Sequence, residues 1–203
     1  MRVVGSRFES CRKIYVGKRI GVHSREQEEI NAILIEHAKK GKRVVRFKGG
    51  DPFVFGRGSE EMEALKAKEI PVTEVPGITS AIAVPAAAGI PVTHRGKSRS
   101  FHVVTAHTKG TADSLPEGLK ELVAVEGTLT VFLMGMHQLS KLAGRLMEYG
   151  KSPETPAAVV QGNFDGKTVS VRGTLLDIAE KVKESGMQSP AVIVIGETAE
   201  MEL

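Results

Sequence analysis

The residues whose types and spacing are best suited to binding or catalysis lie in one short stretch, GGDPFVFGRG, at 49–58. Gly49 and Gly50 allow positive φ and let a ligand approach the backbone N–H and C=O groups closely. Asp51 can accept hydrogen bonds from an ammonium or a hydroxyl group, and Arg57 can bind a carboxylate through two N–H groups. The spacing matches neither the dinucleotide fingerprint nor the P-loop. It fits a ligand loop and a tight turn with a capping aspartate equally well.

A second candidate is the stretch VPGITSAIAVPAAAGIPVTHRG at 75–96, where a Pro-Gly break precedes a helix of small residues. Thr79 and Ser80 stand at the start of that helix, where hydroxyl and free N–H groups can hold a carboxylate or a ribose. Helix capping alone would also explain two hydroxyl residues there. His94 and Arg95 are either surface residues or substrate contacts.

The interpretation of two further stretches depends on the residues around them. Met134, in the stretch FLMGM at the end of an apolar run, can cover a flat ring, although a methionine in such a place is more often part of the core. GNFDGKT at 162–168 superficially resembles a P-loop, but it has one residue too few between its glycines. We interpret Asp165-Gly166 as the turn of a β-hairpin.

Apolar runs rich in β-branched residues predict the strands that position these groups. The runs lie at 14–17, 43–49, 71–77, 101–107, 128–135, 156–161, 168–173 and 190–197, and helical patterns lie at 27–41, 59–69, 136–150 and 174–186. Most runs are continuous, as in strands buried on both faces, and they alternate with helices. This pattern predicts an α/β protein with mostly parallel sheets, in which 168–173 forms an antiparallel hairpin.

The composition changes at THRGKSRS (93–100), a basic stretch that we interpret as a linker. The predicted domains are therefore a partial N-terminal α/β domain at 1–96 and a C-terminal α/β domain at 97–203. The first is incomplete because it has only three clear strands.

The net charge of +4 is distributed unevenly along the chain. Residues 1–100 contain 19 Lys and Arg against 11 Asp and Glu, a balance of +8, whereas residues 101–203 have a balance of −4. Such an excess indicates an anionic ligand, such as a polycarboxylate or a phosphate. A nucleic-acid partner is disfavoured, because aromatic residues make up only 4% of the chain and tryptophan is absent.

Cysteine usage and hydropathy give expectations about disulfides, cellular location, metal sites and membrane spans. Cys11 is the only cysteine, so an internal disulfide is excluded, and a reducing, cytoplasmic location is expected. No metal site is expected, since the sequence has no CxxC pair and only scattered histidines. No membrane span is expected either, because no apolar stretch is long enough.

Seven segments together carry a resemblance to a known family. They are YVGKR (15–19), QEEIN (27–31), RVVRFKGGDPFVFGRG (43–58), EVPGITSA (74–81), GIPVTHRG (89–96), FLMGM (132–136) and SPAVIVIGE (189–197). In this order they resemble the tetrapyrrole methylases, and most closely the uroporphyrinogen-III C-methyltransferases. The resemblance implies two α/β domains that bind S-adenosyl-L-methionine, and usually a homodimer. It implies methylation of two ring carbons of uroporphyrinogen III, giving precorrin-2 for sirohaem and cobalamin.

The resemblance also assigns roles to individual residues. The residues implied to contact the cofactor are Gly49, Gly50, Asp51 and Val54 at its methionine part, Thr79 and Ser80 as a second pair, and Met134 and Gly162 near the adenine. Lys18 matches a proton donor and Arg57 an arginine that handles the substrate. Arg57, His94 and Arg95 are the implied contacts of a polycarboxylate tetrapyrrole.

Some family features have no counterpart in this sequence. They are the opening strand, the GPGDP-type loop after it, and the aspartate of a YDRLV-like segment that is the family's general base. Gln161-Gly162-Asn163 also departs from the family pattern at the adenine side. Two alternatives to the activity above therefore remain: a truncated, inactive relative that only binds tetrapyrrole or cofactor, and another tetrapyrrole or precorrin methyltransferase of the same fold.

Overall fold

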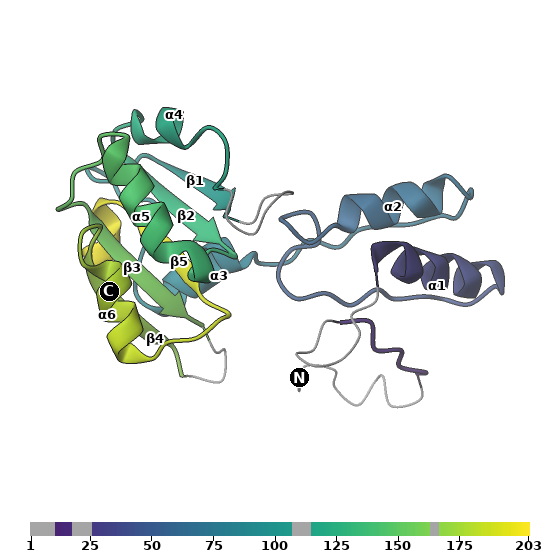
Figure 1. Cartoon of the computed structure of the whole chain (residues 1–203). Helices are drawn as coiled ribbons and strands as arrows, with labels where there is room; N and C mark the ends of the chain where they lie inside the picture. Colours follow the sequence, from purple (N-terminus) through teal and green to yellow (C-terminus); the bar gives the residue numbers. More distant parts are fainter. Residues whose placement is uncertain (1–10, 18–25, 107–114, 163–166) are drawn as a thin grey trace. The chain divides into compact units, whose positions relative to one another are not determined.

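The structure is a computed structural model of the chain and describes residues 11–17, 26–106, 115–162 and 167–203. The chain divides into two compact units (Figure 1). The first unit comprises Met1–Lys48 and Gly56–Pro76, and the second unit comprises Gly49–Phe55 and Gly77–Leu203. The segment Gly49–Phe55, here called the glycine loop, thus packs with the C-terminal part of the chain.

The second unit is built on a five-stranded sheet with the order β1-β2-β5-β3-β4. Its strands are β1 (Ser100–Thr105), β2 (Thr128–Leu133), β3 (Pro156–Gln161), β4 (Val169–Thr174) and β5 (Val192–Ile195). Only β1 and β2 pair in parallel, whereas β5 runs antiparallel to both β2 and β3, and β3 runs antiparallel to β4. The α/β class and the antiparallel pairing of β3 with β4 are confirmed, while the expected turn at Asp165-Gly166 lies outside the described residues. The prediction of mostly parallel sheets is wrong for this sheet.

Helices cover both faces of this sheet, which explains its continuous apolar strands (Figure 1). One face packs against α4 (Leu119–Val123), α5 (Leu139–Glu148) and α6 (Ile178–Ser185), and the other against α3 (Ser80–Ala87) and the short helix η3 (Glu197–Glu200). Along β2, Phe132 enters the first core and Val131 the second. Continuous apolar runs therefore report burial on two faces, and they carry no information on strand direction.

The helices of the second unit follow from ordinary sequence signals. In α5, Leu139, Leu142 and Leu146 are buried at a spacing of three and four residues and form one apolar stripe. A short 3₁₀ turn, η2 (Met136–Gln138), precedes it. Helix α6 ends at Gly186, which adopts the left-handed conformation (φ 67°) typical of a glycine after a helix.

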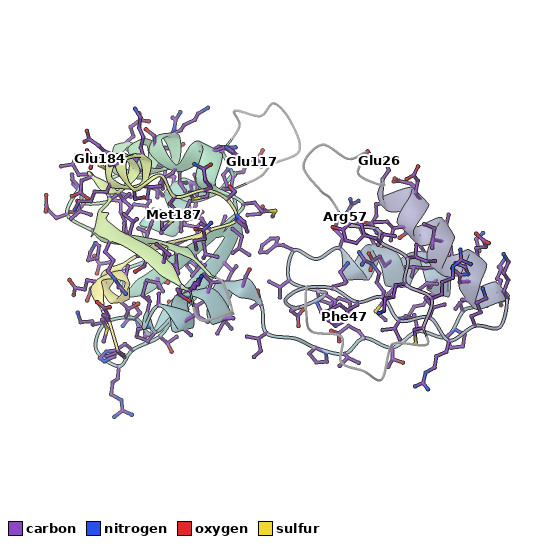
Figure 2. The ribbon with its side chains drawn as sticks, turned by 90° about the horizontal axis from the view of Figure 1, so that it is seen from below. Glu26, Phe47, Arg57, Glu117, Glu184 and Met187 are labelled. Atoms are coloured by element: carbon purple, nitrogen blue, oxygen red, sulfur yellow. The ribbon has the colours of Figure 1, made fainter. Side chains whose placement is uncertain are left out.

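The first unit consists of two helices and the segments that flank them. Helices α1 (Gln27–Lys39) and α2 (Gly58–Lys66) pack through Ile30, Leu34 and Leu65. The predicted strands at 14–17, 43–49 and 71–77 are not found there, because a strand requires a paired neighbour and these segments join no ladder among the described residues. Val45 and Phe47 are 66% and 54% exposed. Figure 2 labels Phe47.

The two units do not divide where the basic stretch suggested. Residues 77–96 belong to the second unit, because the apolar helix α3 buries Ala81 and Val84 against the sheet. The domain boundary at residue 96 remains a prediction, since packing units and the domains of a family need not coincide.

Membrane-spanning helices and clusters of metal-ligating side chains are absent from the described residues. No helix among them is long and apolar enough to cross a membrane. No group of three or more His, Cys, Asp or Glu side chains in this part of the chain is placed to hold a metal ion.

Candidate functional site

The glycine loop lies directly against the segment that leads into α3, and Asp51 joins the two. Asp51 Oδ1 accepts a hydrogen bond from the backbone N–H of Phe53 at 2.8 Å. Its Oδ2 accepts one from the N–H of Gly77 at 3.2 Å. The first bond closes a turn inside the glycine loop, and the second links residues that lie 26 positions apart. Asp51 therefore acts as a turn cap and also as a bridge between two segments.

Gly77 permits this contact because it has no side chain. A Cβ added to Gly77 would lie 2.2 Å from the carbonyl oxygen of Gly50 and 3.1 Å from its carbonyl carbon. Both neighbours are backbone atoms, so no side-chain rotation can relieve the clash. The Pro-Gly pair is thus more than a helix break, since its glycine is the point where two backbones touch.

Gly49 and Gly50 have different surroundings. Gly50 adopts φ +72°, and a Cβ on it would lie 3.8 Å from the backbone N of Ser80, so its peptide lies beside the start of α3. A Cβ on Gly49 would have no described atom within 4 Å. The glycine loop therefore presents open space at Gly49, next to a peptide group held near a helix N-terminus.

The start of α3 supports the capping interpretation of its hydroxyl residues. Thr79 is the N-cap residue, and its Oγ1 accepts a hydrogen bond from the N–H of Ala81 at 3.3 Å. Ser80 is the first residue of the helix and is partly buried. The first N–H groups of a helix lack intrahelical partners and favour negative charge. This end of α3 therefore favours a small anionic group such as a carboxylate.

Met134 and Gly162 follow strands of the same sheet. Met134 comes directly after β2, has φ 58°, and exposes 55% of its surface. A left-handed non-glycine residue is uncommon and is often found at functional sites. Gly162 comes directly after β3, and a Cβ on it would lie 2.8 Å from Cγ2 of Val84 in α3. Close packing against α3 is therefore sufficient to explain this glycine.

His94 and Arg95 lie in a tight turn of the second unit. The backbone N–H of His94 donates to the carbonyl of Ser98 at 2.9 Å, and the N–H of Ser98 donates back at 3.0 Å. Gly96 occupies the turn with φ 89°. The side chains of His94 and Arg95 are both exposed. The turn leaves both available to a ligand, as a substrate-contact role requires.

Arg57 belongs to the first unit and precedes α2 as its N-cap residue, with φ 59° (Figure 2). Its guanidinium makes a bidentate pair with Glu60, with Nε–Oε1 2.9 Å and Nη2–Oε2 2.7 Å. This pair raises the pKa of Arg57, mainly through the hydrogen bond to Glu60. Arg57 is thus a permanent, half-exposed cation. Lys18 lies outside the described residues.

Sequence reasoning missed a buried carboxylate in the first turn of α2. Glu61 is 4% exposed, and its Oε1 accepts hydrogen bonds from Gln27 Nε2 at 3.2 Å, Arg46 Nε at 3.2 Å and Lys48 Nζ at 3.0 Å. The signal was present in the sequence. Glu61 precedes the buried Leu65 by one helical turn, and the apolar run before the glycine loop contains the cations Arg46 and Lys48.

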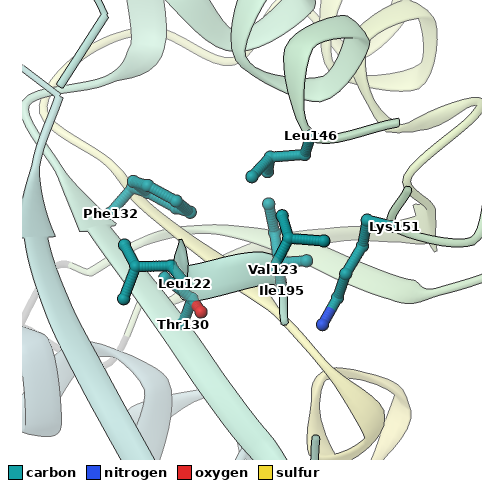
Figure 3. A pocket seen from close by; sticks show the side chains of 7 residues that line it. All are labelled: Leu122, Val123, Thr130, Phe132, Leu146, Lys151 and Ile195. Carbon is teal, nitrogen blue, oxygen red and sulfur yellow. The ribbon is translucent and has the colours of Figure 1, made fainter. Parts of the chain in front are cut away.

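The second unit also contains a small cavity beneath α4 and α5 (Figure 3). Its volume is about 10 Å³, and it is lined by Leu122, Val123, Thr130, Phe132, Leu146, Lys151 and Ile195. A space of that size holds about one water molecule. This cavity is therefore no candidate for a cofactor site.

The site residues coincide with the part of the chain that identifies its family. Residues 6–163 match the family Tetrapyrrole (Corrin/Porphyrin) Methylases. The chain belongs to this tetrapyrrole methylase family. It is 51% identical over 185 residues to the Uroporphyrinogen-III C-methyltransferase of Methanocaldococcus jannaschii, an alignment that covers 91% of this chain and 75% of that protein.

Solved structures of this tetrapyrrole methylase family match the fold. The uroporphyrin-III C-methyltransferase of Thermus thermophilus, complexed with S-adenosyl homocysteine, is similar with a TM-score of 0.75 and 34% identity, over 91% of this chain and 76% of that one. A cobalt precorrin-4 methyltransferase is similar with a TM-score of 0.76 and 26% identity, over 89% of this chain and 73% of that one. The α/β tetrapyrrole methylase fold is therefore confirmed.

Proposed function

We propose that this chain is an S-adenosyl-L-methionine-dependent methyltransferase that methylates two ring carbons of uroporphyrinogen III. The product is precorrin-2, from which sirohaem and cobalamin derive. The observation that carries this proposal is the 51% identity to a uroporphyrinogen-III C-methyltransferase over 91% of the chain. The cobalt precorrin-4 methyltransferase has a similar fold, but its identity of 26% makes that substrate the weaker candidate.

The cofactor would be held by the second unit. We assign its methionine part to Gly49, Gly50, Asp51 and Val54, with Thr79 and Ser80 at the start of α3, and its adenine side to Met134 and Gly162. The open side of Gly49 and the N-terminus of α3 fit the carboxylate of the cofactor. Asp51 can still accept a bond from the ammonium group, because each carboxylate oxygen offers two acceptor sites and only one backbone donor occupies each.

When bound, the cofactor supplies a methyl group on a sulfonium that is already electrophilic. The protein must therefore align the substrate carbon and move protons, which are the usual contributions of positioning and of acid–base groups. We assign proton donation to Lys18, on the strength of the resemblance. Arg57 stays protonated beside Glu60 and can bind a carboxylate of the substrate. We assign further carboxylate contacts to the exposed His94 and Arg95.

We further propose that the protein acts in the cytoplasm as a homodimer. The single cysteine, Cys11, is free and exposed, which suits a reducing compartment. The dimer is proposed from the resemblance alone, and analytical ultracentrifugation of the chain tests it.

The test of the function is methyl transfer from radiolabelled S-adenosyl-L-methionine to uroporphyrinogen III, with the methyl groups on the product counted by mass spectrometry. The proposal expects products with one and then two added methyl groups. Binding of S-adenosyl homocysteine without turnover would favour the alternative of a binding protein. Turnover of cobalt precorrin-4 but not of uroporphyrinogen III would overturn the substrate assignment.

The role of Arg57 has a matched control in α5. Arg57 and Arg145 each form an i,i+3 pair with a glutamate, Glu60 and Glu148, and are 51% and 43% exposed. Arg57→Ala is expected to raise KM for uroporphyrinogen III about tenfold or more, because a charged hydrogen bond contributes about 1.5–3 kcal/mol. Arg145→Ala should leave KM unchanged. Equal effects of the two substitutions would contradict the substrate role.

A further inference from the structure

The first turn of α2 contains a buried charge that the proposed function does not use. Glu61 is 4% exposed, and the side chain of Lys48, whose Nζ lies 3.0 Å from Glu61 Oε1, is only 11% exposed. Arg46 and Gln27 donate to the same oxygen, each at 3.2 Å. A carboxylate so far from water requires partners, and it fixes the geometry of the donors that surround it.

Both ends of the glycine loop are attached to this one helical turn. Lys48 is the residue before Gly49, and it is held by Glu61. Arg57 follows the loop by two positions and is held by Glu60. The Arg57–Glu60 pair is about half exposed on both sides and is therefore weak. The Lys48–Glu61 pair is shielded from solvent, so it dominates this attachment.

We propose that Glu61 is a positioning residue of the cofactor site, which acts through Lys48 on the glycine loop. This inference rests on the proposed function. Gly49 and Gly50 have more backbone freedom than any other residue type, so the conformation of the loop depends strongly on how its first residue is anchored. A loop released at Lys48 samples more conformations and loses more entropy when a ligand orders it. Loss of the anchor should therefore weaken cofactor binding and leave the bound, reacting state little changed.

Two substitutions test the anchor from its two sides, and a third is the control. Glu61→Gln removes the charge with little change in shape. Lys48→Met keeps most of the aliphatic stem and leaves Glu61 with Arg46 and Gln27. Glu63→Gln removes an exposed carboxylate from the same helix. Each variant of the 203-residue chain is compared with the unsubstituted chain by calorimetric binding of S-adenosyl homocysteine and by amide hydrogen exchange in 49–55 without cofactor.

We expect Glu61→Gln and Lys48→Met to weaken S-adenosyl homocysteine binding about tenfold, equivalent to about 1.4 kcal/mol. Both should accelerate exchange in 49–55, and KM for the cofactor should rise while kcat changes much less. Glu63→Gln should change none of these quantities. If Glu61→Gln does not fold, Lys48→Met decides the question alone, because it leaves the buried carboxylate compensated.

Two results would overturn the inference. One is a folded Lys48→Met protein with unchanged exchange in 49–55 and unchanged affinity, and the other is an equal effect of Glu63→Gln. If the unsubstituted chain does not bind S-adenosyl homocysteine, the proposed function fails instead. The exchange comparison still reports whether Glu61 orders the glycine loop, so the two failures are distinguishable.

Discussion

Substitution of Gly77 by alanine should separate the two segments that form the proposed cofactor site. The added Cβ would lie 2.2 Å from the carbonyl oxygen of Gly50, whereas ordinary contacts of such an atom begin at 3.4 Å. The backbones must therefore move apart by about 1.2 Å, the difference between these two distances. The hydrogen bond from the Gly77 N–H to Asp51 Oδ2 is already 3.2 Å long and would be lost.

The displacement of the two backbones and the loss of this hydrogen bond set the expected magnitude of the Gly77→Ala effect. Overpacking at a tight contact typically costs about 1–3 kcal/mol, which lowers Tm by about 2–12 °C in a chain of this size. A displacement of about 1 Å in a binding constellation can cost about a hundredfold in function. We therefore expect Gly77→Ala to lower the affinity for S-adenosyl homocysteine by one to two orders of magnitude, while the protein remains folded.

The assay combines calorimetric titration with S-adenosyl homocysteine and thermal unfolding. Gly144→Ala is the matched control, because a Cβ at that position in α5 meets no described atom within 4 Å. That control should keep full affinity and gain slightly in Tm, since alanine favours a helix over glycine. If Gly77→Ala binds as tightly as the unsubstituted chain and melts at the same temperature, the close approach of the two segments is refuted.

Two further predictions concern the other glycines of the site. Gly49→Ala should leave Tm unchanged, because its Cβ would enter open space, yet it should weaken S-adenosyl homocysteine binding at least tenfold if the cofactor occupies that space; unchanged binding by calorimetry would contradict the assignment. Gly162→Ala should lower Tm because its Cβ would lie 2.8 Å from Val84 Cγ2, and the double variant with Val84→Ala should lose less stability than the sum of the two single substitutions. Additive losses would show that this glycine does not serve packing against α3.

The sheet shows what the sequence could and could not predict. The sequence locates the five strands of the second unit to within a few residues, because β2, β3 and β5 are continuous apolar runs buried between two helical layers. Direction was not predictable, since β5 reads the same whether it runs parallel or antiparallel to β2. The runs at 43–49 and 71–77 have similar composition but no paired neighbour in the described part of the first unit. Strand propensity alone therefore did not make them strands.

The contacts of the candidate site residues could not be predicted from the sequence, and their binding roles stay a prediction. Spacing alone leaves two alternatives for the glycine loop, a capped turn and a ligand loop. The structure supports the capped turn directly, since Asp51 accepts the N–H of Phe53. The structure also shows a hydrogen bond from the Gly77 N–H to Asp51, which no local pattern predicts because the two residues lie 26 positions apart. Thr79 likewise caps α3 while standing where a ligand carboxylate is expected. The structural roles of these residues therefore coincide with the ligand-binding roles that we propose for them.

The proposed function has two parts that can be tested separately, cofactor binding and methyl transfer to the substrate. The residues assigned to the cofactor all belong to the second unit, where the glycine loop, α3 and the ends of β2 and β3 are held by contacts within that unit. Arg57, assigned to the substrate, belongs to the first unit. Cofactor binding should therefore survive Arg57→Ala even where methyl transfer is abolished, whereas Lys48→Met and Glu61→Gln should weaken cofactor binding through the glycine loop. Loss of S-adenosyl homocysteine affinity in Arg57→Ala would contradict this separation.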